Sequence, residues 1–76
     1  MASDIPASSS AARAVVHWDG TEWVAECDGT REYAGPDQIE AEVAARRALG
    51  ARGGGELLIR GVDGRQLKRI VVDATP

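Results

Sequence analysis

The segment Gly55-Glu56-Leu57-Leu58-Ile59-Arg60-Gly61-Val62-Asp63-Gly64-Arg65-Gln66-Leu67-Lys68-Arg69-Ile70-Val71-Val72 decides the fold of this chain. Two runs rich in aliphatic and β-branched residues flank an Asp-Gly pair, which is a strong short-range signal for a β-hairpin. Asp and Gly both tolerate the positive φ angles that a type I′ turn requires. We therefore expect two antiparallel strands joined at Asp63-Gly64, on which the rest of the chain packs.

Asp-Gly pairs also separate three strand-like runs in the first half of the chain, at residues 14–18, 21–27 and 30–34. In the second run Trp23, Ala25 and Cys27 share one face, while Glu22 and Glu26 lie on the other. This alternation is typical of an antiparallel strand with one buried face. The first half of the chain is therefore predicted to form a three-stranded meander.

A helix is predicted between the meander and the hairpin. Asp37 followed by Glu40 matches a capping box, in which each side chain accepts a hydrogen bond from the other residue's backbone N–H. We expect the helix over residues 38–49, with Gly50 as its C′ residue. Its many alanines blur the apolar stripe, so the spacing does not show which face is buried. The predicted class is α+β, an antiparallel β-sheet with one helix packed on it, in the order β-β-β-α-β-β.

Length and composition limit the size and setting of the protein. Residues 1–12 are rich in Ser and Ala and are predicted to be a disordered tail, which leaves residues 13–76 as one small α+β domain. A chain this short buries only about 60% of its unfolded surface, so its stability is expected to be marginal without oligomerisation. The single Cys27 excludes a disulfide framework and fits a reducing cytosol. No signal-peptide core or apolar run of about 20 residues is present, so we expect a cytoplasmic protein without a membrane segment.

No residue pattern predicts catalysis, a cofactor or a metal site. His17 is the only histidine, it alternates with Val16 and Trp18, and no nucleophile motif accompanies it. Cys27 shares its face with apolar residues, which favours a buried, unreactive thiol. Asp19 and Asp63 each precede a glycine in a turn, and turn chemistry explains both. Gly53-Gly54-Gly55 is not followed by the Lys-Ser/Thr pair of a phosphate-binding loop.

The motifs noted so far carry a resemblance to a known family. They are Gly20 with Trp23, Gly29 with Arg31, an acidic and Ala-rich helix through Leu49, and residues 55–65. In this pattern the chain resembles a family of short bacterial proteins catalogued only as domain of unknown function 2188. Two departures stand out, because the family usually has His at the position of Arg60 and an aromatic residue near Val71 and Val72. The resemblance implies a small α+β fold and supplies no activity.

Three consecutive residues near the C-terminus, Ile70, Val71 and Val72, are apolar on both faces of their strand. Such a strand lies either in the centre of a sheet or in a subunit interface. Since one helix can cover only one face of the sheet, nothing else in the chain can cover the second face. We therefore predict an interface here, either in a homodimer or with an unidentified protein partner.

The charge distribution suggests an alternative. The net charge of −3 argues against general nucleic-acid binding, but residues 1–45 sum to −7 and residues 46–72 to +5. Such a basic segment could track phosphates while Trp18, Trp23 or Tyr33 stack on bases, although a solvated mixed surface or pairing of acidic and basic regions between copies would explain it equally. The candidate anion or nucleic-acid patch consists of Arg46, Arg47, Arg52, Arg60, Arg65, Lys68 and Arg69.

Overall fold

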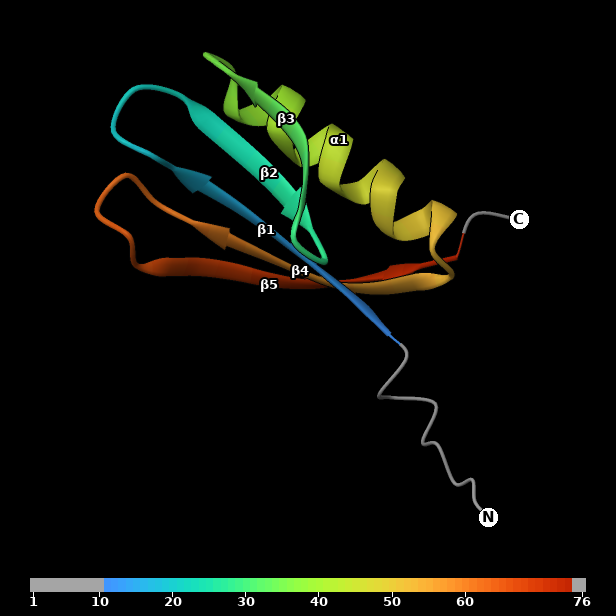
Figure 1. Ribbon diagram of the computed structural model, residues 1–76. Coiled ribbons are helices and arrows are strands. Elements are labelled where there is room, and N and C mark those ends of the chain that lie inside the picture. The colour runs from blue at the N-terminus through green and yellow to red at the C-terminus, as the bar shows by residue number, and fades with distance from the viewer. Residues whose placement is uncertain (1–10, 75–76) are drawn as a thin grey trace.

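The elements follow one another along the chain in the predicted order. The computed structural model describes residues 11–74. The strands and the helix are β1 (Ala12–Trp18), β2 (Trp23–Cys27), β3 (Thr30–Gly35), α1 (Gln38–Ala51), β4 (Gly54–Arg60) and β5 (Gln66–Asp73). The five strands form one sheet, and α1 packs on one of its faces (Figure 1). The predicted α+β class is thus confirmed. The first strand begins at Ala12, the last residue of the predicted tail, and residues 1–10 of that tail lie outside the described residues.

The sheet is mixed, whereas the sequence predicted an antiparallel one. Its strand order is β3-β2-β1-β4-β5, and β4 pairs parallel with β1 while all the other pairs are antiparallel. The reason is the path of α1, which carries the chain back across the sheet to the end at which β1 and β3 begin. A strand that starts there runs in the same direction as β1, as in other crossover connections made by a helix.

The hairpin turns differ in type although all of them contain Asp-Gly. Asp28-Gly29 has positive φ at both residues, 49° and 83°, as the two-residue type I′ turn requires. Asp63-Gly64 was expected to do the same but lies in a longer loop, in which the Gly64 N–H donates to the Gly61 carbonyl and the Gly61 N–H to the Arg65 carbonyl. The Asp63 carboxylate accepts a hydrogen bond from the Arg65 N–H at 3.0 Å and fixes this loop.

Both ends of α1 are capped, but not entirely as predicted. The Asp37 carboxylate accepts from the N–H groups of Ile39 at 2.8 Å and Glu40 at 3.4 Å, which confirms the N-cap. The N–H of Asp37 itself donates to the Tyr33 hydroxyl rather than to Glu40. At the other end the helix continues through Gly50, which is buried, so the prediction of Gly50 as the C′ residue is wrong. Two glycines beyond this end, Gly53 and Gly54, have positive φ, at 93° and 92°.

The hydrophobic core lies between α1 and one face of the sheet. The helix contributes Ala41, Ala45 and Leu49, which repeat every four residues and are fully buried. Because two of these three side chains are methyl groups, the helix axis can approach the strands closely. The sheet contributes Ala12, Ala14, Val16, Ala25, Cys27, Leu57 and Ile59. Within residues 11–74, no helix is both long enough and apolar enough to cross a membrane.

Candidate interaction surfaces

The strand predicted to form an interface, β5, lies at the outer edge of the sheet and pairs only with β4 (Figure 1). Ile70 and Val72 are half-buried and pack against the core on the α1 side. Val71 points to the other face and is 79% exposed. The three residues are thus apolar on both faces at an edge, and not in the centre of the sheet.

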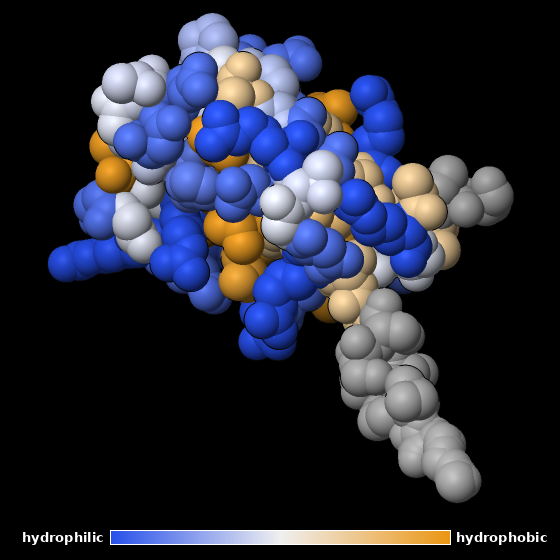
Figure 2. Space-filling view, viewed as in Figure 1, coloured by the Kyte–Doolittle hydropathy of each residue, from blue (hydrophilic) through white to orange (hydrophobic). Residues whose placement is uncertain are grey.

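A second surface is the face of the sheet that α1 does not cover. Along each strand it receives every second residue, and its aliphatic members are Val15, Val24, Leu58 and Val71. Val24 is fully buried there, opposite His17 and Ala34. In Figure 2 a small apolar area near the middle of the molecule is surrounded by hydrophilic side chains. The sequence predicted that one face of the sheet would remain uncovered, but it did not show that Val15, Val24 and Leu58 lie together on it.

Charged side chains on this open face form a short network. Glu56 accepts from Arg69 and lies 3.4 Å from the Arg13 guanidinium, so one carboxylate serves two cations. His17 lies 3.9 Å from Glu26 on the neighbouring strand. Ion pairs of this exposed kind contribute little to stability, about 0–1 kcal/mol each. These ion pairs matter here because they show which charged groups already have a partner within residues 11–74 and which do not.

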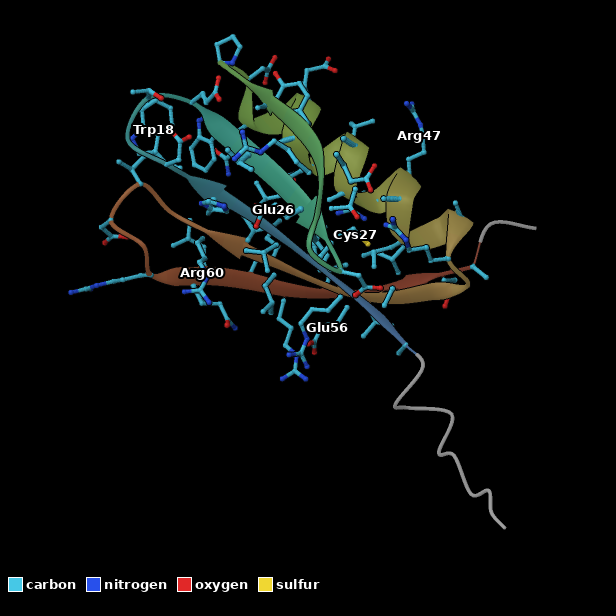
Figure 3. All side chains as sticks on the ribbon, in the orientation of Figure 1. Trp18, Glu26, Cys27, Arg47, Glu56 and Arg60 are labelled. Atoms are coloured by element: carbon cyan, nitrogen blue, oxygen red, sulfur yellow. The ribbon has the colours of Figure 1, made fainter. Side chains whose placement is uncertain are left out.

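The seven predicted basic residues do not gather into one surface. Arg46 and Arg47 lie on the exposed side of α1, whereas Arg60 and Arg69 lie on the opposite, open face of the sheet. Figure 3 shows Arg47 above the helix and Arg60 below the sheet. The remaining three lie elsewhere. Arg52 is at the end of α1, Arg65 is in the hairpin loop, and Lys68 is on the α1 side of β5.

Several of these basic groups are also neutralised locally. Arg52 lies 3.2 Å from the Glu32 carboxylate, and Arg65 lies 3.5 Å from the carboxylate of Asp63. Arg69 shares Glu56 with Arg13, as described above. Nucleic-acid binding requires cations that can neutralise several phosphates along one track. The observed arrangement therefore gives that alternative less support than a contiguous patch would.

The aromatic residues considered for base stacking are engaged elsewhere. Trp18 and Trp23 lie opposite each other on β1 and β2, with ring centroids 5.6 Å apart in an edge-to-face arrangement. Trp23 and Tyr33 pack against the core, and the Tyr33 hydroxyl accepts from the start of α1. Their role in the fold is thus structural.

The single cysteine and histidine are placed as the sequence suggested. Cys27 is completely buried, and this burial raises the pKa of its thiol, although the neighbouring Arg52 guanidinium acts in the opposite direction. His17 lies on the face opposite Val16, beside Glu26. Among residues 11–74, no three His, Cys, Asp or Glu side chains lie close enough together to hold a metal ion.

Comparison with known proteins adds no relative: no family model, no curated protein and no solved structure matches this chain. The two surfaces that could bind a partner are therefore known from the structure of this chain alone: the β5 edge and the open face of the sheet.

Proposed function

We propose that this protein is a non-enzymatic, self-associating module that forms a homodimer through β5. The observation that carries the proposal is the exposure of Val71, 79%, in the middle of an edge strand whose neighbours Ile70 and Val72 are also apolar. An edge strand presents unpaired backbone N–H and C=O groups, and a second strand can satisfy them. Pairing through β5 would at the same time place apolar residues of a second strand beside Val71 and shield part of its side chain from water.

The contrast between the two edges of the sheet supports this choice. β3, at the other edge, carries the charged residues Arg31 and Glu32, and its pairing with β2 contains a register shift between Ala25 and Glu26. Charges and bulges are the usual means by which proteins prevent pairing at an edge. β5 also carries charges, at Lys68, Arg69 and Asp73, and its pairing with β4 shifts register between Ile59 and Arg60, but its stretch from Ile70 to Val72 is uncharged and regularly paired. This stretch is the part of the two edges best suited to pair with a second strand.

The small size of the domain supports self-association for a separate reason. Domains of this size have little stability to spare, and binding a second copy would add to it by mass action. A cytosolic location and kinship with the domain of unknown function 2188 family belong to the same proposal. They rest on the lone cysteine and on the motifs at Gly20-Trp23 and residues 55–65.

The proposal is tested by measuring the mass of the full chain in solution. Sedimentation velocity over a range of concentrations should give a species of twice the 8.0 kDa chain mass. The Val71→Lys variant should be monomeric and still folded by circular dichroism, because Val71 contributes little to the core. Val62→Lys is the matched control, since Val62 is also exposed, at 67%, but lies outside β5. A monomeric wild type, or a dimer that tolerates Val71→Lys, would contradict the proposal.

A further inference from the structure

Two of the three charged residues of β5, the two on the open face of the sheet, are placed symmetrically about Val71. Arg69 lies two positions before Val71 and Asp73 two positions after it, and all three point to the open face, opposite Leu58, Glu56 and Gly54 of β4. Ile70 and Val72, the intervening residues, point to the α1 side. The strand thus carries a cation, an aliphatic residue and an anion in sequence along one face, and two aliphatic residues on the other.

Symmetry limits how two copies of such a strand can pair. In an antiparallel pair, residues directly opposite each other lie on the same face of the sheet, so the two-fold axis must pass beside a residue rather than between two. An axis beside Arg69 would place two arginines opposite each other. An axis beside Ile70 would place Arg69 opposite Val71 of the partner subunit, and Lys68 opposite Val72 of the partner subunit. Parallel pairing in register would bring Lys68 and Arg69 beside their own copies.

An axis beside Val71 gives a different result. Val71 then faces Val71 of the partner subunit, and Ile70 faces Val72 of the partner subunit twice. Arg69 faces Asp73 of the partner subunit, also twice. Every apolar residue meets an apolar residue and every charge in the paired segment from 69 to 73 meets its opposite. Such opposite-charge and aliphatic pairs are the arrangements that stabilise antiparallel strands.

We propose, on the basis of the self-association proposed above, that two copies join β5 to β5 in this antiparallel register. Val71 lies on the two-fold axis, and two Arg69–Asp73 ion pairs between subunits close the ends of the paired segment. The two five-stranded sheets continue into one sheet of ten strands. Because the axis is perpendicular to the sheet, both helices lie on the same face of it.

The intrachain contacts of the two charged residues agree with this register. The Arg69 side chain is 66% exposed although it contacts Glu56, and Glu56 is shared with Arg13. Arg13, Glu56 and Arg69 together leave one positive charge without a counterion on the open face. Asp73 is exposed and makes no ion pair within residues 11–74. A carboxylate from the partner's Asp73 would balance this network.

The helix does not obstruct the approach of a second copy. α1 packs mainly on the strands from β3 to β4 and only slightly on β5. Figure 1 shows the helix beginning beside β3 and ending near the ends of β4 and β5, where it lies on one face of the sheet and not along the outer edge of β5. A second β5 can therefore lie at the usual strand spacing of about 4.8 Å without meeting either helix.

Charge reversal tests the register separately from self-association. Arg69→Asp and Asp73→Arg each place two like-charge pairs in the homodimer, so each variant should dimerise on the order of tenfold more weakly, or worse, than the wild type. When the two variants are mixed, every cross-strand pair again joins opposite charges. The mixture should therefore form a heterodimer in preference to either homodimer, as measured by native mass spectrometry with one variant isotopically labelled. Lys68→Glu changes the charge equally but faces Ala74 of the partner subunit, so its effect should be several-fold smaller.

Cysteine crosslinking gives a second measurement that does not depend on charge. Residues opposite each other in an antiparallel pair have Cα atoms about 4.5–5.5 Å apart, within the range that a disulfide spans. Val71→Cys should therefore crosslink in the presence of oxidised glutathione. Leu67→Cys is the control, because Leu67 is similarly exposed, at 64%, yet lies far from its own copy in this register.

The outcomes separate the two proposals. Preferential heterodimers together with crosslinking at Val71 but not at Leu67 would support the register. Two results would overturn the register but not self-association. One is a wild-type dimer whose charge variants dimerise as tightly as it does, and the other is better crosslinking of Leu67→Cys than of Val71→Cys. A wild type that stays monomeric at all accessible concentrations would overturn both.

Discussion

The close approach of β4 to β1 at Gly55 predicts a large effect from the smallest possible substitution. A Cβ atom added at Gly55 would lie 2.7 Å from the carbonyl carbon and 3.1 Å from the nitrogen of Ala12, and closer still to its carbonyl oxygen. These are backbone atoms of the parallel β1–β4 pair, so no side-chain rotation can relieve the overlap. In the Gly55→Ala variant the two strands must separate locally and weaken their hydrogen bonds.

The expected magnitude follows from the cost of overpacking, which is about 1–3 kcal/mol when atoms can shift. Because the Ala12 backbone is held in the sheet and Ala12 itself is 4% exposed, we expect a loss near the upper end, about 3 kcal/mol. A chain of 76 residues has a total stability of about 4–11 kcal/mol, so this single methyl group would remove a large part of it. The free energy of unfolding is measured by urea titration of tryptophan fluorescence at a fixed protein concentration.

Gly61→Ala is the matched control. A Cβ atom there would meet Leu67 Cδ1 at 3.2 Å and Asp63 Oδ1 at 3.3 Å, which belong to exposed side chains that can move aside. We expect a loss below about 1 kcal/mol, within the range of ordinary surface substitutions. If Gly55→Ala is as stable as the wild type, or if both variants lose the same free energy of unfolding, the β1–β4 backbone contact does not restrict which residues fit at position 55.

Three further predictions concern the cap, a turn and the buried thiol. Asp37→Ala should lower the free energy of unfolding by about 1 kcal/mol, whereas Asp37→Asn, which keeps the acceptor, should change it little; urea titration distinguishes them. Backbone hydrogen bonds from Thr21 and Glu22 lower the pKa of the Asp19 carboxyl, so its contribution to stability is present above pH 3.8 and is lost as the pH falls through the lower folded-state pKa. A carboxyl NMR titration should show this lowered value, and an ordinary value would refute it. The thiol of Cys27 should react with a disulfide reagent at pH 8 many times more slowly in the folded protein than in urea, and equal rates would show that it is accessible.

The order of elements could be predicted from the sequence because it depends on local signals. The Asp-Gly pairs mark chain reversals, and Asp37 marks the start of α1 through hydrogen bonds to residues two and three positions away. The orientation of the helix could not be predicted, because its buried line consists of Ala41, Ala45 and Leu49. The larger Ile39 is 70% exposed, so residue size does not indicate burial here. Alanine occurs on this line because the sheet lies close to the helix there. The distance between helix and sheet is a property of the tertiary structure and cannot be read from the helix sequence.

The candidate sites show the same division between local and tertiary information. Three consecutive apolar residues, Ile70 to Val72, are compatible with a central strand or an exposed edge, and only the strand order distinguishes them. The parallel pairing of β1 with β4 depends on the path of α1 across the sheet and has no signature in either strand. Basic residues of the same basic segment, such as Arg47 and Arg60, lie on opposite sides of the molecule because one is on the helix and the other is on the open face of the sheet.

The seam between β1 and β4 has a consequence for how fast the protein folds. Every other strand pair joins segments that follow each other in the chain or are linked by a short turn, so β1–β3 and β4–β5 can each form from local encounters. The seam alone joins residues far apart in sequence, Ala12 with Gly55, and α1 lies between them in the chain. Closing a long loop costs conformational entropy before the stabilising contacts between the strands form. Pairings of this kind therefore slow folding. Gly55, which lets the two strands meet so closely, is thus expected to affect the rate of folding as well as the stability of the folded protein.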